Sequence, residues 1–266
     1  MPPETPDQTP DRTPSASRVL AIIPARYASS RLPGKPLVSL AGKTMIERVW
    51  RRVALARSVT RTIVATDDER VLNAVRDFGG DAVMTRPTHR SGTERAAEVA
   101  AGPLGQDFAF IVNVQGDEPL LDPAGIDAAI EAFDSDSAIG VSTLAVPIAV
   151  ATDLMDPNIV KTVLDFEDRA LYFSRAPIPW VRDEGGLVHA RHLKHLGLYA
   201  FRRETLLEFP TLPAGVLERV EQLEQLRWLE NGYAIRVVET QNDSVSVDVP
   251  EDVKRVEELL RAAGES

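Results

Sequence analysis

Short apolar runs without polar alternation, separated by stretches of helical periodicity, constrain the fold of this chain more than any other feature. The runs that we interpret as strands lie at 19–25, 62–66, 108–114, 139–146, 195–201 and 234–239, and helical periodicity lies at 44–56, 68–78, 90–101 and 122–133. A strand that is apolar on both faces needs cover on both faces, which helices flanking a parallel sheet provide. The sequence therefore predicts an α/β fold with a doubly wound, mostly parallel (mixed) sheet.

The domain organisation follows from length and from the position of the prolines. A chain of 266 residues suits one large α/β domain, here 18–266. The first 17 residues hold five prolines and no apolar stretch, so 1–17 is predicted to be a disordered tail and not a signal peptide. The α/β rhythm breaks at 150–195, which we interpret as an inserted arm.

Composition excludes several classes of function. The chain has 40 Asp plus Glu against 30 Lys plus Arg, and its net charge of −10 argues against nucleic-acid or anionic-membrane partners. It has no run of 18 apolar residues to cross a bilayer, so we expect a cytoplasmic protein. The absence of cysteine excludes disulfides, thiolate metal sites and a cysteine nucleophile, but a hard cation held by carboxylates remains possible.

The loop after the first predicted strand is basic although the chain is acidic. The stretch 12–46 has six basic residues and no acidic one. "ARYASSRLPGK" places Arg26, Arg31 and Lys35 at the carboxyl end of a strand, where doubly wound sheets bind ligands. The loop is not a Walker motif, because Leu37 stands where that motif needs a glycine, so side chains would hold the phosphates. A solvated surface loop is the alternative.

Two acidic segments also follow predicted strands, and we expect "TDDER" and "QGDEP" to join the basic loop in one pocket. Asp117 in "QGDEP" comes directly after 108–114, and Asp248 in "SVDVPEDVKRV" precedes a helix that begins at a proline. Each aspartate could be a turn or capping residue. Facing a basic loop, the pair would instead hold Mg²⁺, which proteins bind through one or two carboxylates plus substrate phosphates.

A glutamate stands out in "LERVEQLEQLRWLENG", where the pattern predicts one continuous helix over 217–232. At 100° per residue, Glu224 lies beside Leu217, Val220 and Trp228. A carboxylate in an apolar face is costly unless it has a partner. Its partner is either a residue of the protein, in an internal ion pair, or a ligand hydroxyl.

Several motifs together resemble one enzyme family. They are "IPARYASSRLPGKPL", "MTRPTHRSGTERAAEV", "IVNVQGDEP", "ALYFSRAPIPW", "HLGLYAF", "LEQLRWLENGYAIRV" and "VDVPEDV". In this order, over about 19–260, the chain is similar to the 3-deoxy-manno-octulosonate cytidylyltransferases, or CMP-Kdo synthetases. Only the tail and 182–192 fall outside the resemblance.

The resemblance implies a nucleotidyltransferase fold and transfer of CMP from CTP to the anomeric hydroxyl of an eight-carbon 3-deoxy-ulosonic acid, with release of pyrophosphate and a requirement for Mg²⁺. It implies catalytic roles for Arg26, Lys35, Asp117 and Asp248, with the two aspartates as metal ligands. The further residues that match substrate-binding positions are Arg31, Ser91 and Arg95 toward the nucleotide, and Gln115, Arg175, His195, Tyr199, Glu224 and Gln225 around the sugar.

The resemblance also bears on assembly and specificity. The family forms homodimers through an arm in the middle of the chain, and 150–195 occupies the matching place. Lys194 stands where the family pattern leads us to expect arginine, so a bidentate contact there becomes a single point charge that could tune the choice of sugar.

Three other functions fit the sequence less well. A glycosyltransferase would carry an Asp-x-Asp metal motif where this chain has "QGDEP". A sugar-1-phosphate nucleotidyltransferase is disfavoured by Arg175 and His195, which suit an acceptor that bears a carboxylate. A regulatory module that has lost catalysis would lack a catalytic carboxylate or Lys35, and all of them are present.

Overall fold

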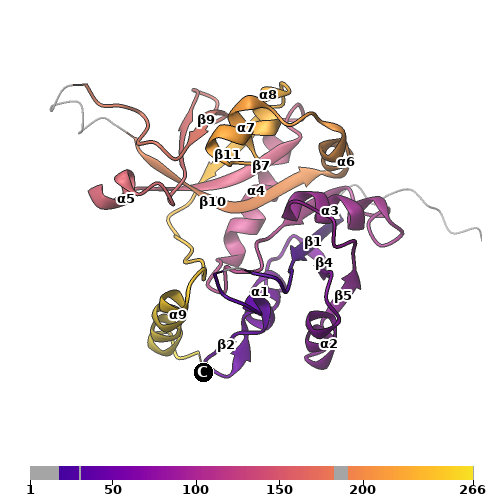
Figure 1. Ribbon diagram of the computed structural model, residues 1–266. Coiled ribbons are helices and arrows are strands. Elements are labelled where there is room, and N and C mark those ends of the chain that lie inside the picture. The colour runs from indigo at the N-terminus through magenta and orange to yellow at the C-terminus, as the bar shows by residue number, and fades with distance from the viewer. Residues whose placement is uncertain (1–17, 30, 183–190, 266) are drawn as a thin grey trace, which may run out of the picture.

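The computed structural model describes residues 18–29, 31–182 and 191–265 (Figure 1). The predicted tail, 1–17, and part of the predicted arm, 183–190, lie outside the described residues. In the described part of the chain, no helix combines the length and the apolar character that crossing a membrane requires.

A nine-stranded sheet forms the centre of the fold. Its strands are β1 (Val19–Pro24), β4 (Val59–Thr66), β5 (Asp81–Met84), β6 (Phe110–Asn113), β7 (Val141–Pro147), β8 (Lys161–Leu164), β9 (Ala170–Ser174), β10 (Leu193–Arg202) and β11 (Ile235–Glu239). The main path runs in the order β11-β7-β10-β6-β1-β4-β5, with β8 paired to β10 and β9 to β8. On this path β10 alone runs antiparallel to its neighbours, so the predicted mostly parallel, mixed sheet is confirmed.

Helices cover both faces of the sheet (Figure 1). They are α1 (Met45–Val53), α2 (Glu69–Asp77), α3 (Gly92–Ala101), α4 (Pro123–Ser135), α5 (Ala151–Met155), α6 (Arg203–Glu208), α7 (Val216–Glu221), α8 (Leu226–Glu230) and α9 (Pro250–Ala262), with the 3₁₀ turns η1 (Lys35–Leu37) and η3 (Phe209–Thr211). One apolar core joins α1, α2 and α4 to one face of the sheet, and a second core joins α3, α6 and α8 to the other. Successive residues of a strand point to opposite faces, so β1 contributes to both cores and has no polar alternation.

A third, small core places the C-terminal helix beside the basic loop. Leu40 of the short hairpin β2 (Ser39–Leu40) and β3 (Lys43–Thr44) packs with Val247 and with Val256 of α9. The backbone N–H of Val247 donates to the carbonyl of Asp117 at 2.9 Å. These contacts bring the residues before α9 to the carboxyl end of β6.

The structure corrects the predicted helix 217–232. The chain leaves α7 at Gln222, which adopts a left-handed conformation with φ of 55°, and begins again as α8 at Leu226. Glu224 therefore lies in a turn and not on a helical face. Leu217 and Val220 are exposed, so the apolar stripe predicted beside Glu224 does not exist.

Candidate active site

The basic loop leaves β1 and ends in η1, which positions Lys35. Gly34 precedes Lys35 with φ of 68°, a conformation that favours glycine, and a Cβ at Gly34 would lie 3.1 Å from the Tyr27 hydroxyl oxygen. Pro36 follows at the start of the 3₁₀ turn and presets its backbone. Gly34 and Pro36 therefore fix the backbone on either side of Lys35, whose side chain is only 14% exposed.

The two predicted aspartates meet at the end of this loop. Lys35 Nζ donates to Asp117 Oδ2 at 2.5 Å and to Asp248 Oδ1 at 2.9 Å. Arg31 Nη2 donates to the same Asp248 oxygen at 2.9 Å. Asp248 is fixed from behind, because its backbone N–H donates to Asp252 Oδ2 in the first turn of α9 at 2.8 Å. The sequence predicted that both aspartates close strands beside a basic loop. Asp117 does follow β6, but Asp248 lies in a non-strand segment between β11 and α9, so its predicted strand end is wrong. One ammonium group nevertheless bridges both carboxylates.

A cleft of about 720 Å³ opens around this cluster. It is lined by Pro24, Ala25, Arg26, Tyr27, Ala28, Ser29, Arg31, Pro33, Gly34, Lys35, Pro36, His89, Arg90, Ser91, Gly92, Arg95, Gln115, Gly116, Asp117 and Asp248. Gly116 permits the close approach of the two strand ends, because a Cβ there would lie 2.9 Å from the carbonyl oxygen of Pro24. The structure therefore gathers all the nucleotide-side and metal-site residues named from the sequence, together with Gln115.

The segment "TDDER" does not line this cleft, so the expectation that it joins the pocket is wrong for the described residues. Asp67 instead accepts from Arg95 Nη2 at 2.7 Å, and Asp68 caps α2 by accepting from the Arg70 backbone N–H at 2.9 Å. The Arg70 guanidinium in turn stacks on the Tyr27 ring at 3.4 Å. The segment therefore supports the cleft from outside by holding Arg95 and Tyr27.

The remaining predicted residues form a second group around β10 and the α7–α8 turn. They are Arg175, His195, Tyr199, Glu224 and Gln225, and none of them lines the cleft. The rings of His195 and Tyr199 lie 5.4 Å apart. Burial lowers the pKa of His195 to about 3, so this imidazole is neutral at physiological pH. Its Nε2 lies 2.9 Å from Thr143 Oγ1, which leaves it a hydrogen-bonding and not a cationic role.

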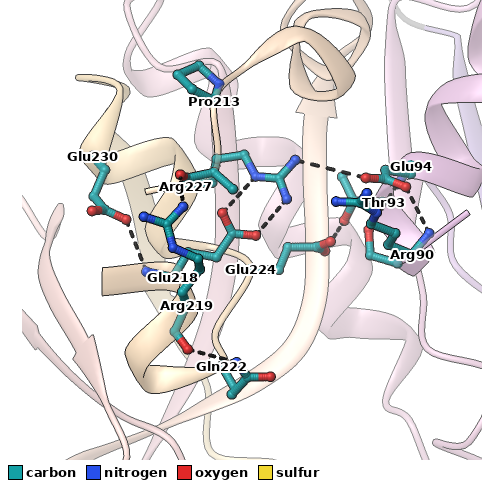
Figure 2. Close-up of polar contacts among 12 residues, drawn as sticks. Arg90, Thr93, Glu94, Pro213, Glu218, Arg219, Gln222, Glu224, Arg227 and Glu230 are labelled. Carbon is teal, nitrogen blue, oxygen red and sulfur yellow. Dashed lines mark hydrogen bonds and ion pairs between the residues drawn. The ribbon is translucent and has the colours of Figure 1, made fainter. Parts of the chain in front are cut away.

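Glu224 belongs to this second group and is joined to the first (Figure 2). Thr93 on α3 donates its hydroxyl to Glu224 Oε1, while Glu224 Oε2 is buried without a partner among the described residues. Burial raises the pKa of Glu224, and hydrogen bonds from the Ser91 and Thr93 hydroxyls oppose the rise. Among the described residues Glu224 forms no internal ion pair, and its hydrogen-bond partner is instead the Thr93 hydroxyl.

Arg175 holds the turn that carries Glu224. Its Nε donates to the carbonyl of Glu221 at 2.8 Å and its Nη1 to the carbonyl of Pro157 at 2.9 Å. The Glu221 carboxylate in turn accepts from the Arg175 backbone N–H at 3.0 Å. In this conformation the guanidinium serves the protein backbone, and a substrate carboxylate would have to share it or displace these bonds.

Lys194, the departure from the expected arginine, forms a salt bridge. Its Nζ donates to the two carboxylate oxygens of Asp243 at 2.7 and 3.0 Å. Asp243 lies in the loop between β11 and Asp248, so this salt bridge joins β10 to the segment that carries the second aspartate.

The donor set suits a divalent cation that the substrates help to bind. The described residues contain no cluster of three or more His, Cys, Asp or Glu able to hold a metal. Two carboxylates that share one cation, Lys35, nevertheless match the small number of protein ligands that Mg²⁺ takes when phosphates supply the others.

Sequence reasoning missed several residues of the cleft. Tyr27, His89 and Arg90 line it, and the side chain of Arg90 is exposed toward solvent. A signal for two of them was present in "HRSGTER", since the residues immediately before a helix start lie where anions bind. Nothing in the sequence singled out Thr93 or Asn113, because a threonine in a helix and an asparagine at a strand end are common structural residues.

Comparison with known proteins assigns the class. The family profile described as "Cytidylyltransferase" matches residues 20–240. A 4-diphosphocytidyl-2C-methyl-D-erythritol synthase from Anaerococcus prevotii, only 12% identical, shares the fold with a TM-score of 0.62 over 92% of this chain and 99% of that one. The α/β fold and the basic cleft that faces two aspartates thus define a nucleotidyltransferase.

Closer relatives give the family. The 3-deoxy-manno-octulosonate cytidylyltransferase of Solibacter usitatus is 50% identical over 92% of this chain and 96% of its own, and that of Syntrophotalea carbinolica is 53% identical over 91% and 98%. A CMP:2-keto-3-deoxy-manno-octonic acid synthetase solved in complex with CTP is 41% identical, with a TM-score of 0.87 over 93% of this chain and 100% of that one. The chain belongs to the 3-deoxy-manno-octulosonate cytidylyltransferase family.

Proposed function

We propose that this protein transfers CMP from CTP to the anomeric hydroxyl of 3-deoxy-D-manno-octulosonate (Kdo), giving CMP-Kdo and pyrophosphate. The observation that carries the proposal is the cluster in which Lys35 bridges Asp117 and Asp248 at 2.5 and 2.9 Å inside a basic cleft. The membership of the chain in the cytidylyltransferase family, and the CTP bound in a relative that matches nearly all of it, support the same reaction.

The basic loop would bind the triphosphate. Arg26 is exposed in the cleft and has no hydrogen bond or ion pair that the described residues supply, so its guanidinium is available to phosphate oxygens. Arg31 and Lys35 add two further positive charges at the aspartates. Together they would neutralise the charge that builds on pyrophosphate as it leaves, which is the usual electrostatic contribution to phosphoryl-type transfer.

Asp117 and Asp248 would hold Mg²⁺. When bound, the ion would supply charge neutralisation at the α-phosphate and align it with the attacking hydroxyl. The chain's own contribution is to keep the two carboxylates together, through the backbone bond from Val247 to Asp117 and the capping bond from Asp248 to Asp252. Mg²⁺ is proposed from the carboxylate donor set.

The sugar would lie between the cleft and the second group of residues. Gln115 lines the cleft next to β10, and the side chains of His195 and Tyr199 come from β10 itself. Glu224 Oε2 is a buried acceptor without a partner among the described residues, which suits a sugar hydroxyl. Since His195 is neutral, the carboxylate of the sugar would depend on hydrogen bonds and on the metal for its charge balance.

We also propose that the protein is a homodimer that uses the arm 150–195 and its surroundings. Large apolar side chains are exposed on the arm, among them Trp180 at 80% and Leu171 at 63%. Val220, 76% exposed, lies on α7, whose Glu221 accepts a hydrogen bond from Ser174 of the arm. Apolar surface of this kind is typical of a protein–protein contact. The cytoplasmic location and the tail at 1–17 stay predictions from the sequence.

One assay tests the function. The protein is incubated with Mg²⁺, CTP and a panel of 3-deoxy-ulosonic acids, and pyrophosphate release is followed. We expect release that depends on both CTP and a ulosonic acid. Release with a sugar 1-phosphate in place of the ulosonic acid, or glycosyl transfer from a nucleotide sugar, would contradict the assignment.

A further inference from the structure

A buried hydroxyl connects the nucleotide side of the site with the sugar side. Thr93 is the second residue of α3, directly behind the cleft residues Ser91 and Gly92, and is 1% exposed. Its Oγ1 donates to Glu224 Oε1 in the α7–α8 turn (Figure 2). The same oxygen accepts a hydrogen bond of 3.3 Å from Nδ2 of Asn113, the last residue of β6.

The direction of these hydrogen bonds is fixed by chemistry. A threonine hydroxyl has one proton and two lone pairs, whereas an amide NH₂ group can only donate. Because Asn113 Nδ2 donates to Thr93 Oγ1, the single hydroxyl proton is free to point at Glu224. Asn113 is 0% exposed, so no solvent competes for its side chain.

Glu224 needs such a partner because no regular secondary structure fixes it. Its backbone lies in the turn whose carbonyls Arg175 binds, at Glu221 and, at 3.4 Å, at Gln222. That contact fixes the turn but not the side chain. The Thr93 hydroxyl holds Oε1 and leaves Oε2 as the buried oxygen without a partner among the described residues.

The charged and titratable groups around Glu224 come from four elements, α3, α7, α8 and β10. Arg227 on α8 is bound by Glu218 of α7 at 2.6 Å, and it lies 4.0 Å from Glu94 on α3 (Figure 2). Tyr199 on β10 is buried, and both its burial and the Glu224 carboxylate raise its pKa. The cation Arg227 is thus already engaged by Glu218, so the partners of Glu224 are hydroxyls: Thr93, which donates to Oε1, and Ser91, whose hydroxyl also lowers the pKa of Glu224.

We propose that Thr93 is a positioning residue for the acceptor sugar: its hydroxyl, oriented by Asn113, holds one oxygen of Glu224 so that the other faces a sugar hydroxyl. The inference rests on the proposed function, because it assigns Oε2 to the sugar. Thr93 itself touches neither substrate in this account. Its effect should therefore appear in the use of the sugar and not in the binding of CTP.

Thr93→Val tests this, with Thr93→Ser as the matched control. Valine keeps the shape of threonine and removes the hydroxyl, whereas serine keeps the hydroxyl. For Thr93→Val we expect kcat/KM for the sugar to fall by about 10- to 100-fold, the scale of a misplaced contact, with KM for CTP within a factor of about two of wild type. Thr93→Ser should recover most of the loss, and the thermal shift caused by CTP should be the same in all three proteins.

The pH profile provides a readout that a purely structural defect would not move. A hydrogen bond to the charged form of a carboxyl lowers its pKa, so removing the hydroxyl should raise the pKa of Glu224. The acid limb of kcat/KM for the sugar should move to higher pH in Thr93→Val and should be lost in Glu224→Gln. The double variant should be little worse than Glu224→Gln alone, because both changes act through one carboxylate.

The outcomes separate the two claims. An unchanged kcat/KM for the sugar and an unmoved acid limb in Thr93→Val, with normal turnover by wild type, overturn the positioning role alone. Losses that multiply in the double variant also overturn it. A wild-type protein that binds CTP but transfers nothing to any ulosonic acid overturns the proposed function and this inference with it. If Thr93→Val does not fold, Thr93→Ala, which leaves room for water near Asn113, replaces it in every comparison.

Discussion

Replacing Lys35 by methionine should strengthen Mg²⁺ binding to the nucleotide-free protein while it destroys catalysis. The ammonium donates to Asp117 and Asp248 at 2.5 and 2.9 Å, so a divalent ion that enters between the carboxylates must displace at least one of these bonds. A charge-assisted hydrogen bond contributes about 1.5–3 kcal/mol. Removing that competition should tighten Mg²⁺ binding by about 10- to 100-fold.

The same change should lower thermal stability in the absence of metal. Arg31 still pairs with Asp248, but Asp117, whose side chain is 27% exposed, loses its cation. A loss of about 1–3 kcal/mol from an unpaired, partly buried charge corresponds to about 2–4 °C in Tm for each kcal/mol in a domain of this size. Mg²⁺ should restore more of the Tm in Lys35→Met than in wild type, by linkage.

Calorimetric titration with Mg²⁺ and melting in EDTA or Mg²⁺, all without nucleotide, measure both effects. Lys254→Met is the matched control, because it removes the same charge from an exposed position on α9 outside the cleft. Turnover with CTP should fall by the equivalent of about 2–4 kcal/mol in Lys35→Met, since the leaving pyrophosphate loses its cation. Mg²⁺ affinity that is equal to or weaker than that of wild type would refute the idea that Lys35 and the metal compete for the two carboxylates.

Four further predictions follow from the site and from the tail. Asp117→Asn and Asp248→Asn should each reduce kcat by about a hundredfold with little change in Tm, and the double variant should be little worse than the worse single one; losses that multiply would contradict a shared ion. Glu224→Gln should impair use of the sugar without weakening CTP binding, and because burial raises the pKa of this carboxyl, its Tm relative to wild type should increase as the pH rises through that pKa. Burial and the neighbouring Asp117 raise the pKa of Glu118 from 4.5 to about 7. As the pH rises from about 4.5 to about 7, the folded state of wild type should therefore lose up to about 3 kcal/mol of stability relative to Glu118→Gln, measured by melting in EDTA. A difference in stability that does not change with pH would show that Glu118 does not titrate. Deleting 1–17 should leave turnover and Tm nearly unchanged, and a Tm lower by several degrees would show that the tail packs on the domain.

The sequence predicted the central sheet well, because its signal is local. β1, with its apolar residues on both faces, was found within one residue of its observed end, and the neighbouring helices were placed correctly. β5 was missed, since it has only four residues and each of them is partly buried or exposed. Strand ends were also enough to select Lys35, after β1, and Asp117, after β6, whereas the strand predicted to end at Asp248 is not present.

What the sequence could not provide was any arrangement that depends on distant contacts. The helix predicted over 217–232 breaks at Gln222, where Arg175 binds the carbonyls at the end of α7. Helical periodicity carries no signal for a contact from Arg175, which lies just after β9 and far away in the sequence. The meeting of Asp117 with Asp248 likewise depends on the packing of α9 against Leu40. The role of Thr93 was invisible for the same reason, since its partner Glu224 is 131 residues away.

The packing of α9 determines when the site is complete during synthesis of the chain. Every strand of the described sheet precedes Asp248 in the chain, so the sheet and the basic loop can leave the ribosome and fold before this carboxylate emerges. Until α9 docks through Val256 and Leu260, the nascent protein has a cleft with Lys35 and Asp117 but only half of its carboxylate pair. With the roles proposed above, a growing chain would bind nucleotide before it could hold the metal, and catalysis would begin only after α9 has docked.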